Sequence, residues 1–170
     1  MFILDDLKNP GLTTQGNRWQ FFTDGVMGGM SSGKVKIKKV EGITCYHMTG
    51  NVTTENNGGF IQMRVRIKPP IQFPIQSNDY EGIYLKTYGN NYKYAVHIRT
   101  PYTKLPWQYY SLKSVANRNW KIIKLPFDDF KKSNFYQTKS LSYNNIVTLG
   151  IVAGFDNFQS DICISEIGFY

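Results

Sequence analysis

Two short runs that each contain adjacent glycines constrain this chain more than any other part of its sequence. Residues 19–33 read WQFFTDGVMGGMSSG and residues 55–60 read ENNGGF, and both lie between segments with the composition of β-strands. A glycine pair lets the backbone adopt positive φ and approach another backbone where a Cβ would clash. Between strands, such pairs usually mark tight turns or bulges. We therefore predict that the two runs let separate stretches of main chain lie against each other.

The first run also carries three apolar side chains, Val26, Met27 and Met30, which are unusual in a loop that only connects strands. A solvated turn is more often built from Asn, Asp, Ser and Gly throughout. Residues 24–32 are therefore expected to form a folded loop that either packs onto the protein or stays apolar for a partner. Packing is the favoured alternative, because buried methionine is most often a filler of gaps in the interior.

Alternation of apolar and polar residues with a period of two predicts the strands. Residues 60–67 alternate cleanly, and a hairpin is expected over residues 34–52. A second hairpin is expected from residues 82–88 and 92–100, because Gly89-Asn90-Asn91 between them is a strong turn sequence. The remaining expected elements are strands at 18–22, 107–112, 120–125, 146–153 and 161–169, helical turns at 5–8 and 127–130, a proline-rich loop at 68–78 and a polar stretch at 133–145.

About nine or ten strands of about 5–8 residues, with almost no helix, predict an all-β sandwich or jelly roll. The aromatic content of 15% also favours strands. At 170 residues the chain has the length of one domain. We expect residues 1–16 to form a lead segment and residues 17–170 to form the domain.

The net charge of +8 permits an anionic partner but selects none. No nucleic-acid-binding pattern accompanies the lysines, so no nucleic-acid partner is expected. No stretch is long and apolar enough to span a bilayer, although peripheral contact with a membrane surface is allowed. The start of the sequence lacks the features of a signal or transit peptide, which favours a cytoplasmic protein. Cys45 and Cys163 each lie in an apolar run and are expected to be buried free thiols.

Few residues suggest chemistry. Asp24 and Glu55 each stand beside a glycine run and could form an acid–base pair. A structural role is favoured, because acidic and amide side chains in turns usually bond backbone amides. His47 and His97 are isolated and lie in no metal-binding pattern, so neither a metal nor another cofactor is expected. The glycine runs match no phosphate-binding loop.

One set of polar and aromatic residues could share an outward sheet face if the strands pair as sequence neighbours. Jelly rolls can bind ligands along such a face, with aromatic rings as platforms and arginines for carboxylates. A solvated polar face, which every sandwich needs, explains the same residues equally well. The set comprises Arg64, Arg66, Tyr84, Lys86, His97, Arg99 and Tyr109.

The two glycine runs together resemble those of the complex I intermediate-associated protein 30 family, assembly factors of NADH:ubiquinone oxidoreductase. The resemblance extends over about residues 19–170. It implies a galactose-binding-like β-sandwich (a jelly roll) and a non-catalytic role in holding assembly intermediates, and it brings no catalytic residues with it. The residues that match the family signature are Trp19, Asp24, Gly25, Met27, Gly28, Gly29, Ser31, Glu55, Asn56, Gly58, Gly59 and Phe60.

The sequence shows neither an organellar presequence nor the fused dinucleotide-binding domain of some relatives, so it resembles a stand-alone bacterial-type member. Three hypotheses follow. The leading one is a binding module or assembly chaperone that recognises a protein partner. The second is a carbohydrate-binding domain that uses Tyr84, Trp107 and Tyr109. The third is an enzyme, such as a hydrolase, that uses Asp24 and Glu55.

Overall fold

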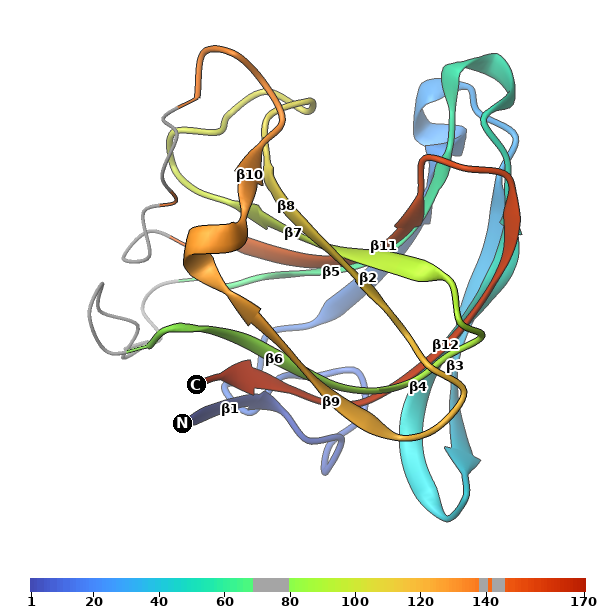
Figure 1. The fold of residues 1–170 in the computed structure, drawn as a ribbon, viewed down its shortest axis with the longest axis vertical. Helices are drawn as coiled ribbons and strands as arrows, with labels where there is room; N and C mark the ends of the chain where they lie inside the picture. The colour runs from blue at the N-terminus through green and yellow to red at the C-terminus, as the bar shows by residue number, and fades with distance from the viewer. Residues whose placement is uncertain (69–79, 138–140, 142–145) are drawn as a thin grey trace.

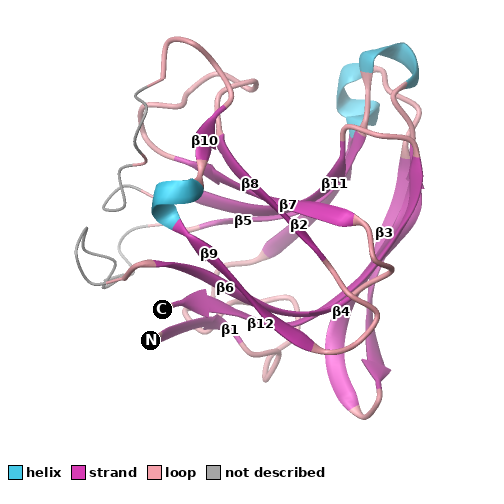
Figure 2. Ribbon diagram, in the orientation of Figure 1, coloured by secondary structure: helices cyan, strands magenta, loops and turns pink. Residues whose placement is uncertain are grey.

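A computed structural model describes residues 1–68, 80–137, 141 and 146–170 and shows two antiparallel sheets packed face to face (Figures 1 and 2). The first sheet has the strand order β3-β4-β12-β6-β9, and β1 pairs with the C-terminal end of β12. Its strands are β1 (Phe2–Asp5), β3 (Ser32–Val40), β4 (Ile43–Val52), β6 (Gly82–Tyr88), β9 (Lys121–Pro126) and β12 (Phe158–Phe169).

The second sheet has the strand order β10-β8-β7-β11-β5-β2. Its strands are β2 (Trp19–Thr23), β5 (Phe60–Arg66), β7 (Lys93–Arg99), β8 (Tyr110–Val115), β10 (Lys131–Lys132) and β11 (Thr148–Gly154). The helical structure in the described ranges consists of three short 3-10 segments, η1 (Asp24–Met27), η2 (Glu55–Asn57) and η3 (Phe127–Asp129). The chain is therefore an all-β jelly-roll sandwich, as the strand pattern predicted.

The hydrophobic core lies between the two sheets and follows the alternation read from the sequence. On β5, Ile61, Met63 and Val65 are buried in the core. Their neighbours Gln62 and Arg64 face away from it, on the outer surface of the second sheet. This outer surface carries the candidate site.

The hairpin expected over residues 34–52 is confirmed, because β3 pairs with β4 along its whole length. Gly33 and Gly50 lie opposite each other in this pairing. A Cβ on Gly50 would overlap the carbonyl oxygen of Ser32, so these two strands can approach closely only with glycine there.

The second expected hairpin is wrong, because β6 belongs to the first sheet and β7 to the second. The turn between them crosses from one sheet to the other. Its amides bond a different segment: Gly89 N–H donates to the carbonyl of Asn117, and Asn91 N–H donates to that of Ala116. The turn sequence was recognised correctly, but its hydrogen bonds attach it to the end of β8 rather than closing a hairpin.

At the N-terminus, β1 pairs antiparallel with β12. Residues 5–8 form no helical turn: Leu7 has a φ of +57°, and its N–H donates to the Asp5 carboxylate 2.8 Å away. The strand expected at 107–112 begins only at Tyr110, because residues 101–109 form turns. The loop expected at 68–78 lies outside the described residues except for its first position, and so does much of the stretch at 133–145.

Candidate functional site

Asp24 joins the two glycine runs through its side chain. The carboxylate is fully buried and accepts four hydrogen bonds. The N–H and Oγ of Ser31 donate at 3.0 and 2.6 Å, and the backbone N–H groups of Gly59 and Phe60 donate at 2.5 and 3.2 Å. One side chain thus ties the loop after β2 to the loop before β5.

The glycines around this carboxylate are required by space. A Cβ on Gly58 would lie 2.9 Å from the Cα of Gly29 and would overlap the Asp24 carboxyl group. A Cβ on Gly29 would overlap the same carboxyl group. The prediction that the two glycine doublets let separate stretches of main chain lie together is therefore confirmed.

These contacts contradict a catalytic pair of Asp24 and Glu55. Burial by itself raises the pKa of the Asp24 carboxyl, but the hydrogen bonds from Ser31, Gly59 and Phe60 outweigh it, and the pKa lies below its usual value. A carboxylate that is buried and held by four donors cannot exchange protons with a substrate. Glu55 is exposed on η2 and is not among the donors or acceptors of this cluster.

The apolar residues of the first glycine run are exposed rather than packed. Val26, Met27 and Met30 are 72%, 63% and 56% exposed. The expected packing of this loop through its methionines is therefore wrong. The polar cluster of Asp24 holds the loop instead, which leaves the apolar side chains outside.

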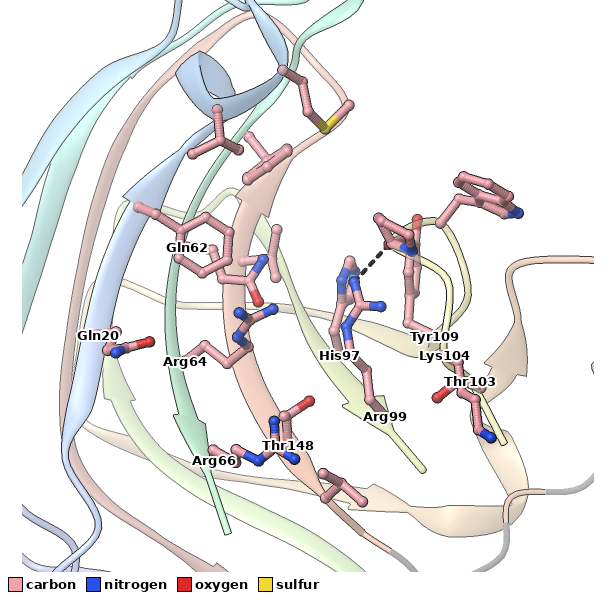
Figure 3. A pocket seen from close by; sticks show the side chains of 18 of the residues that line it. Gln20, Gln62, Arg64, Arg66, His97, Arg99, Thr103, Lys104, Tyr109 and Thr148 are labelled. Atoms are coloured by element: carbon pink, nitrogen blue, oxygen red, sulfur yellow. Dashed lines mark hydrogen bonds between the residues drawn. The ribbon is translucent and has the colours of Figure 1, made fainter. Parts of the chain in front are cut away.

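An open groove of about 1540 Å³ runs across the outer surface of the second sheet (Figure 3). Its floor consists of outward-facing side chains of β2, β5, β7 and β11. One end is bordered by η1, where Val26 and Met27 line it, and another side by residues 100–109. The Asp24 cluster therefore builds part of the groove wall.

Two rows of side chains cross the groove floor, because paired residues of neighbouring strands lie side by side on one face. In the first row, Thr148 on β11 pairs with Arg66 on β5 and with Arg99 on β7. In the second row, Gly150 pairs with Arg64 and with His97. Figure 3 shows Thr148 between the two arginines of its row. Gly150 has no side chain and leaves room above the strand, which the side chain of Gln62 enters.

An aromatic stack stands beside these rows. The rings of His97 and Tyr109 lie 4.0 Å apart at an angle of 11°, and Phe155 lies 6.0 Å from His97 on a nearly parallel plane. Burial lowers the pKa of His97 to about 3, and the positive charges of Arg99 and Lys113 contribute. The imidazole is therefore neutral at physiological pH.

The three arginines of the floor have different surroundings. Arg99 donates to the backbone carbonyls of Leu105, Pro106 and Gln108 at 2.7–3.1 Å and so fixes the loop at the groove wall. The Cζ of Arg64 lies 4.7 Å above the ring centre of Phe22, within the range of a cation–π contact. Neither Arg64 nor Arg66 has a hydrogen bond or ion pair with any residue that the structure describes.

Five of the seven residues expected on one binding face lie together: Arg64, Arg66, His97, Arg99 and Tyr109 all line the groove. Tyr84 and Lys86 do not, because β6 belongs to the first sheet. The hydroxyl of Tyr84 donates to Glu166 at 2.6 Å, and the ring is buried against Gly168. The expectation that all seven share a surface is wrong for these two.

The family-signature residues are mostly structural. Gly25, Gly28, Ser31 and Asn56 belong to the two loops that the Asp24 cluster joins, and Gly28 ends η1 with a φ of +85°. Trp19 faces the core, and its indole N–H donates to Asp5 at 2.7 Å. The signature residues that line the groove are Met27, Gly58 and Phe60.

Sequence reasoning missed Thr148 and Gly150 as parts of the groove floor. The sequence predicts one strand over residues 146–153, and the prediction assigns no side chain of it to either face. Leu149, Ile151 and Ala153 face the core, so the residues that alternate with them, Thr148, Gly150 and Val152, lie on the groove side of β11, and the side chains of Thr148 and Val152 line the groove. That alternation was the signal that could have found both.

Among the described residues, no group of three or more histidine, cysteine or acidic side chains could hold a metal ion. His47 lies on the first sheet, 2.7 Å from a carboxylate oxygen of Asp161, and so cannot join His97 on the second sheet. Cys45 and Cys163 are buried free thiols, as expected. None of the helical segments in the described ranges has the length and apolar character that crossing a bilayer requires.

Solved structures with a similar fold include carbohydrate-binding modules. A family 11 module from Clostridium thermocellum, in complex with a β-1,3-1,4-mixed-linked tetrasaccharide, has a TM-score of 0.73 at 15% identity, covering 99% of this chain and 94% of that one. The family 11 module of a cellulosomal cellulase from the same organism has a TM-score of 0.71 at 15% identity, covering 98% and 92%. At such identity the likeness concerns the fold alone.

A comparison with curated proteins gives no match. The family model for complex I intermediate-associated protein 30 does match, over residues 8–164 of the 170 residues. This match extends over both glycine runs and most of the sandwich. The chain therefore belongs to the complex I intermediate-associated protein 30 family.

Proposed function

We propose that this protein is a non-catalytic binding module that holds its partner in the groove of the second sheet. The observation that carries the proposal is the groove itself, an open space of about 1540 Å³ lined by arginines and aromatic rings. The candidate acid–base residue, Asp24, is occupied by backbone and Ser31 donors and contributes to the wall rather than to chemistry. This combination favours binding over turnover.

Family membership supports an assembly intermediate of NADH:ubiquinone oxidoreductase as the partner. An assembly chaperone needs a surface that is preformed and open, and the groove floor belongs to paired strands rather than to loops. The exposed Val26 and Met27 at one end add an apolar contact surface. Methionine-rich surfaces adapt well to protein ligands. Such a role fits the cytoplasmic location expected from the sequence.

The proposal is tested by gene deletion and complementation in a host that possesses complex I. The deletion strain is expected to accumulate subcomplexes, and the wild-type protein to restore assembly. Gly150→Val should fail to restore it, because the new side chain takes the space that Gln62 now occupies and displaces Gln62 on the groove floor between Arg64 and His97. Thr49→Val on β4 of the first sheet is the matched control. Normal complex I in the deletion strain would count decisively against this function.

Carbohydrate binding is a second candidate function, favoured by the aromatic stack. The ring of Tyr109, which stacks on the buried His97, and the 57% exposed Trp107 offer flat apolar surfaces of the kind on which sugar rings can lie. The fold shared with carbohydrate-binding modules agrees with this use. A glycan array with the wild-type protein and Tyr109→Ala tests it. Binding that disappears in the variant would support carbohydrate binding, and no binding to any glycan on the array would exclude it.

A further inference from the structure

Two buried polar atoms in the groove have no hydrogen-bond partner among the described residues. They are Oγ1 of Thr148 and Nε2 of His97. Both residues line the groove and are more than nine-tenths buried, at 8% and 6% exposure. Buried polar side chains in folded proteins are almost always hydrogen-bonded. An unpaired hydroxyl at the groove floor therefore indicates a place for a polar group of a ligand.

Positive charge surrounds that hydroxyl. Thr148 pairs with Arg66 on one side and Arg99 on the other, and Arg64 occupies the next row. Burial lowers the pKa of both Arg64 and Arg99, and the nearby charge of another arginine lowers each further, so these cations repel one another. No Asp or Glu is among the described residues that line the groove. An anionic group would relieve this repulsion.

The hydrogen-bonding groups of the groove floor further restrict the class of ligand that can bind there. Arginine has only donors, and an ionised carboxylate has only acceptors. A planar guanidinium also matches a carboxylate through two parallel hydrogen bonds. Arg99 already donates to three backbone carbonyls, whereas Arg64 and Arg66 have no acceptor in the described part of the chain. These two arginines and the Thr148 hydroxyl are therefore free to bind one carboxylate group.

We propose that Arg64, Arg66 and Thr148 form a carboxylate-binding subsite, and that its occupant is an acidic segment of a polypeptide partner. This inference rests on the proposed function, because it concerns the same groove. It adds the chemistry that the partner must present, namely glutamate or aspartate side chains next to apolar ones. The apolar neighbours would contact Val26 and Met27 at the end of the groove.

The groove favours a peptide over a sugar chain for two reasons. Sugar hydroxyls both donate and accept, whereas Arg64 and Arg66 offer donors only. The aliphatic side chains of Val26 and Met27 would remove water from sugar hydroxyls without replacing their hydrogen bonds. The same side chains bury favourably against leucine or methionine of a peptide.

The test uses the whole ¹⁵N-labelled protein and the capped peptide Leu-Glu-Glu-Leu at millimolar concentrations. NMR spectra report the side-chain Nε–H groups of Arg64 and Arg66 and the backbone N–H groups near Thr148. We expect saturable shifts of these resonances. The double variant Arg64→Gln/Arg66→Gln should bind at least about tenfold more weakly, and Thr148→Val should bind a few times more weakly. The peptide Leu-Lys-Lys-Leu should cause no saturable shift.

A matched double variant distinguishes binding at a specific subsite from a general attraction of the peptide to positive charge. Lys36→Gln/Lys39→Gln removes the same charge from β3 on the first sheet and should leave binding unchanged. Equal weakening in both double variants would overturn the subsite, and so would the absence of shifts in the wild-type protein. Tighter binding of tetragalacturonate than of the peptide would overturn the polypeptide assignment in favour of an acidic saccharide.

The measurement uses purified protein, so its outcome is independent of the role in complex I assembly. A peptide that binds as expected, together with normal complex I in the deletion strain, would refute only the proposed function. A peptide titration without NMR shifts, together with incomplete complex I assembly in the deletion strain, would refute only the subsite.

Discussion

The carboxylate of Asp24 accepts a hydrogen bond from the backbone N–H of Gly59, 35 residues further along the chain. This bond connects the end of β2 to the start of β5, two strands that are already neighbours in the second sheet. It therefore adds little to the sheet itself. Its effect is to fix the loops beyond the strands, which carry Met27 and Gly58 to the groove next to Phe60, the first residue of β5. The two glycine runs thus shape the groove wall without supplying most of its contact groups.

Replacing Asp24 should destabilise the protein strongly. Asp24→Asn puts an amide NH₂ where one carboxylate oxygen now accepts bonds, so at least one buried donor loses its partner. We expect the free energy of unfolding to fall by about 2–3 kcal/mol, measured by urea titration. Glu55→Gln is the control and should change it by less than about 0.5 kcal/mol, because Glu55 is exposed. Equal, small effects of both variants would contradict the structural role of Asp24.

Gly58→Ala should destabilise through a steric overlap. The added Cβ would press on the Asp24 carboxyl group and lie 2.9 Å from the Cα of Gly29, so the two loops must move apart. Gly42→Ala provides a comparison, because Gly42 has a φ of +79° in open space and incurs only backbone strain, about 1–2 kcal/mol. We expect Gly58→Ala to cost about 1–3 kcal/mol more. Thermal and urea unfolding of both variants measure the difference, and a smaller loss for Gly58→Ala would refute the close contact.

Much of this fold could be predicted from local sequence. The alternation on β5 places Ile61, Met63 and Val65 in the core and Arg64 in the groove, because side chains of a strand alternate between its faces. The glycine doublets predicted a close approach of two loops. Both features depend on residues near each other in sequence or on a steric requirement that only glycine meets.

The sheet to which each strand belongs could not be predicted in the same way. The turn at residues 89–91 reads as a hairpin, yet β6 and β7 enter different sheets because each finds partners far away in the chain. This error placed Tyr84 on the groove face. The row that Thr148 forms with Arg66 and Arg99 could not be predicted either, although alternation does give the face of Thr148, because β5, β7 and β11 are distant in sequence. Strand order depends on packing between sheets, which alternation does not report.

Tyr84→Phe should affect stability but not binding. The variant loses the hydrogen bond from the Tyr84 hydroxyl to Glu166, which should lower the free energy of unfolding by about 1 kcal/mol. Its groove is unchanged, because β6 lies in the first sheet. Co-purification of the partner from the host should therefore equal that of the wild-type protein, whereas Tyr109→Ala should reduce it. If Tyr84→Phe no longer co-purified with the partner, Tyr84 would have to belong to the binding surface.

The stability of the protein should decrease on acidification in a way that depends on His97. Its pKa is about 3 in the folded protein, mainly because the ring is buried, with Arg99 and Lys113 contributing, and about 6.5 when unfolded. Between these two values the unfolded chain binds a proton at His97 that the folded protein does not. Lowering the pH from about 6.5 towards 4 therefore favours unfolding, by up to about 1.4 kcal/mol per pH unit from this residue.

The variant His97→Gln isolates that contribution. It loses the stack on Tyr109, so the variant is expected to be less stable than the wild-type protein at pH 7. The test does not depend on this difference in stability at pH 7, but on how the difference changes with pH. Carboxylates such as Asp24 titrate in both proteins and cancel in the difference. Urea unfolding at several pH values should therefore show the stability advantage of the wild-type protein shrinking steadily as the pH falls. A difference that stays constant from pH 7 to pH 4 would mean that His97 is protonated as readily in the folded groove as in the unfolded chain.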